Sequence, residues 1–205
     1  MKNELNFLNN LNRNFKLNFS VLSIIIFFEI LSCKSKTLTK KKNDNPNIIL
    51  IMSDDMGYSD ISPYGGEIDT PNLSDLAKNG IKFTQFYNAA RCCPTRASLL
   101  TGTYPHQAGI GHMMGNYGIS QYQGKLSYNV ITIPEVLKKA GYSTIMSGKW
   151  HLTKNDLDQW PLKRGFDNFY GLISGAANYF KSEYPGLIFE GNEKLNIDDE
   201  NYYTT

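Results

Sequence analysis

The sequence contains few cysteines and no apolar segment long enough to span a membrane as a helix. Its 205 residues include three cysteines, of which Cys92 and Cys93 are adjacent and Cys33 lies near the N-terminus. Such a set provides no disulfide framework of the kind found in small secreted domains. The most apolar segment, Val21 to Leu31, falls short of the roughly 18 residues that a membrane-spanning helix requires.

Most of the chain also lacks an excess of positive charge. The formal net charge is +2, but residues 1–46 hold eight of the 21 Lys and Arg and only three of the 19 Asp and Glu. The remaining residues carry 13 basic and 16 acidic side chains, a net charge of −3. That balance excludes binding to nucleic acid by charge. The hydrophobic content of 41% is typical of a globular protein, and the length suits one ordinary domain.

The first 33 residues have the pattern of an export signal. Three positive charges precede the apolar segment Val21 to Leu31, as in the leaders of secreted proteins. The segment ends in Ile30-Leu31-Ser32-Cys33, which resembles a lipobox, where lipid is attached to the cysteine. We therefore predict that residues 1–33 are a lipoprotein signal peptide. An ordinary cleaved signal or a short membrane anchor is the alternative.

Residues 34–45 form a lysine-rich segment without apolar periodicity. Such a segment cannot bury enough apolar surface to fold, and we expect it to be a flexible linker. Leader and linker together predict an exported protein held at a membrane by lipid on Cys33, as a periplasmic, outer-membrane or cell-surface lipoprotein. The folded part is therefore expected to begin at residue 46.

Strand patterns alternate with helix patterns along the folded part. Residues 47–52 are nearly all apolar, as in strands that are buried on both faces of a parallel sheet. Thr70-Pro71 and the capping-box sequence Thr132-Ile133-Pro134-Glu135 each mark the start of a helix, with the threonine as N-cap. This alternation predicts an α/β fold with a largely parallel central sheet flanked by helices. We expect strands at 47–52, 81–87 and 142–147, and helices at 71–79, 94–101 and 133–140.

Two adjacent carboxylates, Asp54 and Asp55, follow the first predicted strand. Adjacent carboxylates repel each other and are costly to bury unless a positive group binds them. A hard divalent cation, Ca²⁺ or Mg²⁺, would meet that need, provided that the chain turns at Asp54. A solvated Asp-Asp loop is the alternative interpretation, because loops are rich in aspartate.

Cys92 lies just ahead of a predicted helix, where free N–H groups and the helix dipole favour anions. Pro94 suits the first helical turn. Arg96, four residues on, can reach back to the same place and hold an oxyanion. From the residues alone, Cys92 is either an activated thiolate or an inert structural cysteine.

Several ordered blocks resemble the sulfatase family. The stretch Cys92-x-Pro94-x-Arg96 followed by Ala97-Ser98-Leu99-Leu100-Thr101-Gly102 is similar to the sulfatase signature. Further similar blocks lie before and after it, and the resemblance covers residues 46–205. These blocks are Pro46-Asn47-Ile48-Ile49, Asp54-Asp55-Met56-Gly57-Tyr58, the segment from Tyr104 to Met113, Gly148-Lys149-Trp150-His151-Leu152 and Arg164-Gly165-Phe166-Asp167.

The resemblance implies a sulfate-ester hydrolase whose nucleophile is made from Cys92. In that family a dedicated maturation enzyme oxidises this cysteine to formylglycine, whose hydrate has two hydroxyl groups. One hydroxyl attacks sulfur and expels the alcohol, and the second then releases the sulfate. A plain serine or cysteine lacks the second hydroxyl and would stay trapped as the ester.

The resemblance also implies roles for the other matching residues. Asp54 and Asp55, with the residue made from Cys92, match metal ligands for Ca²⁺ or Mg²⁺. Arg96 matches a group that steadies the formylglycine, Lys149 one that contacts sulfate, and His151 one that contacts the nucleophile or the leaving oxygen. Because Lys149 and His151 are two residues apart, they would share a face of an extended segment.

The resemblance further implies a sulfated small molecule or polysaccharide as the substrate. Family members are much longer and supply further metal ligands from later segments, so we expect this chain to be the N-terminal part of a longer catalytic domain, inactive by itself. One alternative function is a phosphatase or phosphonate monoester hydrolase of the same superfamily. Another is an inactive, truncated lipoprotein in which Cys92 is never converted.

Overall fold

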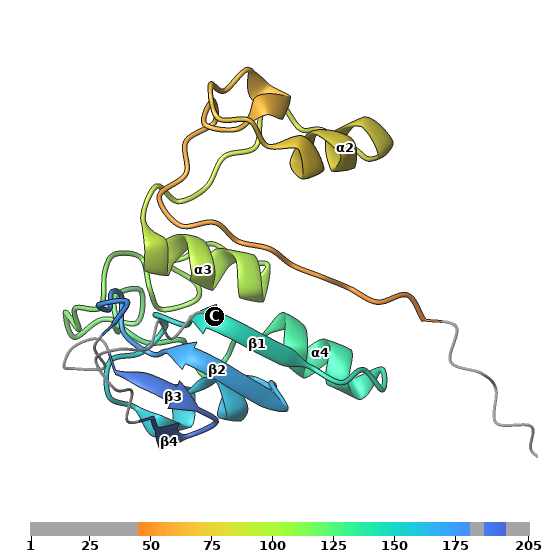
Figure 1. Cartoon of the computed structure of the whole chain (residues 1–205). Helices are drawn as coiled ribbons and strands as arrows, with labels where there is room; N and C mark the ends of the chain where they lie inside the picture. Colours follow the sequence, from red (N-terminus) through yellow and green to blue (C-terminus); the bar gives the residue numbers. More distant parts are fainter. Residues whose placement is uncertain (1–44, 181–186, 196–205) are drawn as a thin grey trace, which may run out of the picture. The chain divides into compact units, whose positions relative to one another are not determined.

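The computed structural model describes residues 45–180 and 187–195 (Figure 1). The predicted leader and nearly all of the predicted linker lie outside these residues. The chain divides into two compact units, Met1–Ile51 and Met52–Thr205. Within the described residues, no helix combines the length and the apolarity that crossing a membrane would take.

The strand predicted at 47–52 is wrong for this chain. Residues 45–52 contain no helix or strand, and the side chains of Ile49 and Ile51 are exposed. A strand is defined by its hydrogen bonds to a neighbour, and apolar composition alone supplies none.

The second unit contains a four-stranded sheet in the order β1-β2-β3-β4. Figure 1 shows the strands side by side. The first two strands are parallel and the other two pairings are antiparallel, so the described part of the sheet is mixed. The strands are β1 (Ile145–Lys149), β2 (Asn168–Leu172), β3 (Ile188–Glu190) and β4 (Glu193–Lys194).

Three α-helices accompany the sheet, each at a predicted position. They are α2 (Pro71–Asn79), α3 (Cys92–Thr101) and α4 (Ile133–Lys139), and three short 3₁₀ helices, η1 (Ser62–Tyr64), η2 (Leu157–Gln159) and η3 (Pro161–Arg164), complete the set of described helices. The predicted capping box of α4 is present, because the Thr132 side chain accepts from the N–H of Glu135, whose carboxylate accepts from the N–H of Thr132. Thr70 precedes α2 but does not cap it with its side chain.

Two predicted strands differ from the structure. Residues 81–87 form no strand, and Phe86 and Tyr87 are exposed. The strand predicted at 142–147 is instead β1, at 145–149. It starts later because the N–H groups of Gly141 and Tyr142 bond to the carbonyls of Lys138 and Leu137, a Schellman motif that ends α4.

The core of the second unit joins α3 to the segment after β1. Trp150 and Leu152 are completely buried, as are Ala97 of α3 and Ile110. The Trp150 ring packs edge-on against Phe166, with 6.2 Å between ring centroids, and its indole N–H donates to the carbonyl of Gln159. This packing fixes the position of the residues on either side of Trp150, namely Lys149 and His151.

Candidate active site

The predicted site residues gather between the N-terminus of α3 and the C-terminal end of β1. Cys92 and Arg96 lie on α3, whereas Lys149 ends β1 and His151 follows two residues later. Asp54 reaches the same place from the loop after residue 51. Segments about 40 to 55 residues apart in the sequence therefore supply one cluster.

Helix α3 begins at Cys92 after an extended Arg91, and no side chain caps its start. The first N–H groups of a helix have no partner within the helix and, with the dipole, favour a negative group. At the other end, Gly102 adopts the left-handed conformation and donates its N–H to the carbonyl of Ser98. The local sequence thus places the two cysteines at an anion-favouring helix terminus.

The two adjacent cysteines have different surroundings. Cys92 is partly exposed, whereas Cys93 is completely buried. The Cys93 sulfur lies 3.6 Å from the Met113 sulfur and 3.8 Å from Nε2 of His151. Burial, reinforced by the neighbouring Cys92, raises the pKa of Cys93 to about 12. Cys93 is therefore a neutral thiol in the core, and Cys92 is the one that faces the site.

Arg96 connects α3 to the end of β1. Its guanidinium donates to the carbonyl of Lys149 and lies 3.7 Å from the carboxylate of Asp54. The side chain is almost completely buried, and burial lowers the pKa of Arg96 below its ordinary value. Its Nε is buried and has no hydrogen-bond partner within the described residues.

Lys149 and Asp54 form the other ion pair of the site. The Lys149 ammonium lies 2.6 Å from Oδ2 of Asp54, and the lysine side chain is only 14% exposed. This hydrogen bond is the main cause of an Asp54 pKa below the ordinary value, and it outweighs partial burial, which acts in the opposite direction. Two cations and one carboxylate thus meet at the end of β1, with positive charge in excess.

His151 reaches the site through a left-handed backbone conformation, with a φ of 54°. Both Lys149 and His151 reach the cluster with their side chains, although the backbone at His151 is left-handed and not extended. Burial, followed by repulsion from Lys149 and Arg96, lowers the pKa of His151 to about 4. The imidazole is accordingly neutral near pH 7, and only a fairly strong acid would transfer a proton to it.

Gly175 gives the His151 ring its space, a role that the sequence did not signal. A Cβ atom at Gly175 would lie 2.5 Å from Cε1 of His151, which is closer than atoms pack. Met113 lies in the family-like block from Tyr104 to Met113, but its contact with Cys93 was not predicted. Both residues come from segments whose position depends on tertiary packing.

The metal site predicted at Asp54 and Asp55 is not tested by the structure and stays a prediction. The chain bends at Asp54, as the turn hypothesis requires, but Asp54 is paired with Lys149 and Arg96. Within the described residues, the potential ligand group of three or more members consists of Cys92, Cys93 and His151. Two carboxylates fall short of the six or more oxygens that Ca²⁺ takes, so these residues are at most part of such a site.

Comparison with known proteins gives one consistent family. Residues 46–205 match the family model named Sulfatase. The chain is 44% identical over 153 residues to a protein of Schizosaccharomyces pombe named as an uncharacterized sulfatase, covering 71% of this chain and 27% of that protein. It is 42% identical to an arylsulfatase of Klebsiella aerogenes, with coverages of 70% and 32%. The chain thus spans about a third or less of the length of these relatives.

Solved structures agree in fold. The crystal structure of Ps i-CgsB matches with a TM-score of 0.65 and 32% identity, over 78% of this chain and 38% of that one. A second structure, solved with its substrate D-glucosamine-2-N,6-O-disulfate, matches with a TM-score of 0.57 and 32% identity, over 73% and 27%. The predicted α/β fold class is thereby confirmed, for a part of the domain.

Proposed function

The chain belongs to the sulfatase family, and we propose that it supplies the nucleophile and part of the sulfate-binding pocket of an enzyme that hydrolyses sulfate esters. One observation carries this proposal beyond family membership. Cys92, Arg96, Lys149 and His151, taken from two separate sequence blocks, meet at the N-terminus of α3 and the end of β1. The reaction takes a sulfate ester and water and yields an alcohol and inorganic sulfate.

We propose that Cys92 is converted to formylglycine by a maturation enzyme, as the family pattern implies. Its partial exposure and its place at the helix N-terminus support this assignment. Cys93 is completely buried against Met113 and His151, which suits a structural role. The hydrated aldehyde would then present one hydroxyl for attack on sulfur and a second for release of sulfate.

Arg96 and Lys149 are well placed to bind the sulfate group. Both are cations with little exposure to water, so their attraction for an anion is only weakly screened. The start of α3 adds N–H groups that favour the same charge. In the structure Asp54 partly neutralises both cations, which keeps the site from carrying an uncompensated double charge.

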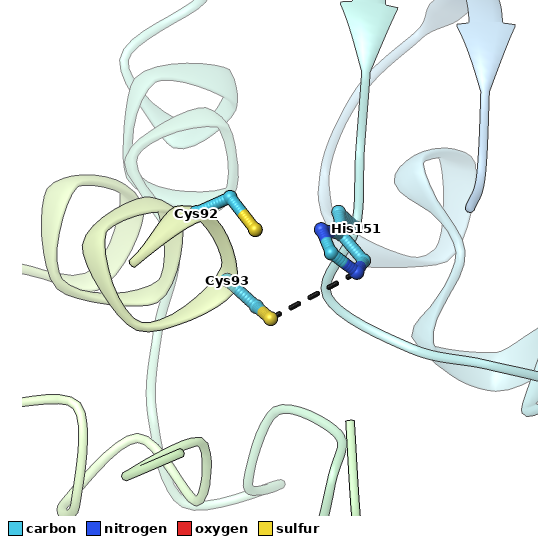
Figure 2. Close-up of side chains that lie close together, drawn as sticks. All are labelled: Cys92, Cys93 and His151. Atoms are coloured by element: carbon cyan, nitrogen blue, oxygen red, sulfur yellow. Dashed lines mark hydrogen bonds between the residues drawn. The ribbon is translucent and has the colours of Figure 1, made fainter. Parts of the chain in front are cut away.

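His151 fits a proton-transfer role at the leaving oxygen or at the nucleophile. Its Nε2 lies 3.8 Å from the Cys93 sulfur (Figure 2), and its Nδ1 is buried without a hydrogen-bond partner within the described residues. A neutral imidazole can pass a proton between groups on its two nitrogens. Because Lys149 and Arg96 already carry two positive charges, a third on His151 is disfavoured, and a proton taken by His151 would be passed on readily.

We propose that Asp54 and Asp55 supply part of a divalent cation site, for Ca²⁺ or Mg²⁺, together with the residue made from Cys92. Carboxylate oxygens are the ligands that these hard cations prefer, and the other ligands would come from the rest of the longer enzyme. When bound, such a cation would make a hydroxyl of the nucleophile more acidic and offset the charge of sulfate.

We further propose a sulfated saccharide as the substrate and an exported, lipid-anchored enzyme. Support for the substrate comes from the related protein that was solved with a disulfated glucosamine. Support for export comes from the charged and apolar pattern of residues 1–33 and the lipobox-like sequence ending in Cys33.

An activity assay with matched cysteine variants tests the proposal. The protein from its native host should hydrolyse a chromogenic aryl sulfate much faster than the matched aryl phosphate. Cys92→Ala should abolish the aryl sulfate activity, whereas Cys93→Ala should retain most of it if the variant folds, as circular dichroism would show. A faster rate on the phosphate, or full activity in Cys92→Ala, would overturn the assignment.

A further inference from the structure

Before conversion of Cys92, the side chains of Cys92, Cys93 and His151 form a compact group of sulfur and nitrogen donors. Figure 2 shows both cysteine side chains on one face of the start of α3, with the His151 ring opposite them. Their ligand atoms, two sulfurs and one ring nitrogen, all lie within 4.8 Å of one another. None of the hard oxygen donors at Asp54 and Asp55 belongs to this group.

We propose that the unconverted chain binds Zn²⁺ through the sulfurs of Cys92 and Cys93 and a ring nitrogen of His151. Two thiolates and one imidazole with an open fourth position form a known type of zinc site. Sulfur and nitrogen ligands on one tetrahedral zinc ion lie about 3.5 Å apart, and the Cys93 sulfur lies 3.8 Å from Nε2 of His151. The ligands therefore need little movement to reach a common ion.

The charge balance also favours this ion. Each cysteine thiol loses its proton to solvent when it binds, so two thiolates neutralise the two charges of Zn²⁺ and the neutral imidazole adds none. A complex without net charge avoids repulsion by the nearby Arg96 and Lys149. The N-terminus of α3, which carries both cysteines, favours negative charge, and the bound ion would offset the burial that keeps Cys93 protonated in its absence.

The surroundings of the cluster also suit a soft ion. Cys93 and Trp150 are completely buried and His151 nearly so, and Met113 places a thioether 3.6 Å from the Cys93 sulfur. Cys92 is the partly exposed member of the group, so an ion can reach the site from its side. Zn²⁺ binding is independent of sulfatase activity. If Cys92 is converted as proposed above, one thiolate disappears, so only the unconverted protein would hold the ion.

The test uses Co²⁺ as a coloured substitute for Zn²⁺ in the full chain, produced without a maturation enzyme and with its thiols reduced. Cys33→Ser serves as the background, because Cys33 is the third thiol of the chain. We expect one Co²⁺ per chain, a thiolate-to-cobalt charge-transfer band, and loss of that band when Zn²⁺ is added. Absence of the band at saturating Co²⁺ would overturn the proposal.

Matched variants assign the ligands. Cys93→Ser should weaken binding about 100-fold or more, because serine does not replace a thiolate on zinc. Asp75→Asn, at an exposed carboxylate of α2, should bind Co²⁺ within about threefold of the background protein, because that carboxylate lies outside the donor set. Unchanged affinity in Cys93→Ser would overturn the proposal.

A measurement without a core substitution guards against misfolded variants. Zn²⁺ should slow the alkylation of Cys92 in the Cys33→Ser background by about tenfold or more, because a zinc-bound thiolate is a weaker nucleophile than a free one. The same concentration of Ca²⁺, which prefers oxygen ligands, should leave the rate unchanged. An alkylation rate that Zn²⁺ does not alter would contradict the proposed site.

Discussion

Residues 52–90 and residues 92–173 of the second unit differ sharply in packing. The first region includes helix α2 and no buried residue, and Ile81, Phe86 and Tyr87 are each at least 75% exposed. The second region contains nearly all of the buried core, including Trp150, Leu152 and Ile110. All of the predicted catalytic residues lie in the well-packed region, and the carboxylates predicted to bind metal lie in the exposed one.

The contrast shows which parts of the fold are stabilised by nearby sequence. Helix α4 has its own capping box and Schellman motif, and α3 ends at a left-handed Gly102. Arg96 of α3 donates to the carbonyl of Lys149 at the end of β1. Residues 81–87 have the composition of a strand, but within the described residues they have no strand neighbour to pair with. Large exposed apolar side chains of this kind are typical of a surface that another part of a protein covers.

The largest expected effect is at Trp150. Trp150→Ala should destabilise the protein by about 3–5 kcal/mol, because it removes a completely buried ring and leaves a cavity. Leu76→Ala in α2, where the side chain is 68% exposed, should change the stability by less than about 0.5 kcal/mol. Urea unfolding of both variants measures the two losses of stability. Equal losses would contradict the difference in packing between the two regions.

A second effect is expected at Arg164, which joins three segments of the packed region. Its buried guanidinium donates to the side chains of Glu135 and Gln159 and to the carbonyl of Val130. Arg164→Ala leaves these acceptors without their donor and should cost about 3 kcal/mol. The exposed neighbour Lys163 provides the control, since Lys163→Ala should cost less than about 0.5 kcal/mol. Similar unfolding midpoints for the two variants would contradict this account.

A smaller effect separates the two threonines that precede helices. Thr132→Ala should destabilise the protein by about 1–2 kcal/mol, because its side chain caps α4 and donates to the carbonyl of Arg164. Thr70 does not cap α2, and its hydroxyl bonds instead to Ser62. Thr70→Ala should therefore leave the helicity of α2 unchanged, which amide hydrogen exchange along α2 would show. Faster exchange along α2 in Thr70→Ala than in the wild type would contradict it.

The smallest effect is a pH dependence at Asp167. A hydrogen bond from Lys138, with a second from the N–H of Thr144, holds the pKa of Asp167 at about 2, below the ordinary value of 3.8. Because the folded pKa is the lower one, the ionised carboxylate stabilises the fold above about pH 4, and this contribution is lost as the pH falls towards 2. The stability difference between wild type and Asp167→Asn should therefore shrink over that interval. A difference that stays constant would contradict the ion pair.

The sequence predicted those parts of the fold that short-range signals determine. The capping box at Thr132 and the glycines after α3 and α4 act within one helical turn, so these helices appear where they were expected. The strand at 81–87 depends on a neighbour, which composition cannot supply. At Tyr142 the end of α4 competes with the predicted strand. The N–H of Tyr142 bonds to the carbonyl of Leu137 in α4, and β1 begins three residues later.

The sequence was sufficient to predict which residues form the site, but not how their backbones and side chains are positioned. The resemblance selected Cys92, Arg96, Lys149 and His151, which the structure brings together. It did not reveal that His151 takes a left-handed conformation, that Gly175 makes room for its ring, or that Asp54 pairs with Lys149. Each of these features depends on contacts between segments far apart in the sequence. The roles of the leader and of Cys33 stay predictions.

Peptide mass spectrometry of the protein from its native host tests the central claim most directly. The account predicts that the peptide containing residues 92 and 93 carries an aldehyde at Cys92 and an intact thiol at Cys93. Fragment ions distinguish the two adjacent positions, and trapping with a hydrazide confirms the aldehyde. A peptide in which both residues remain cysteine, in protein that is fully folded, would contradict the claim that Cys92 is the source of the nucleophile.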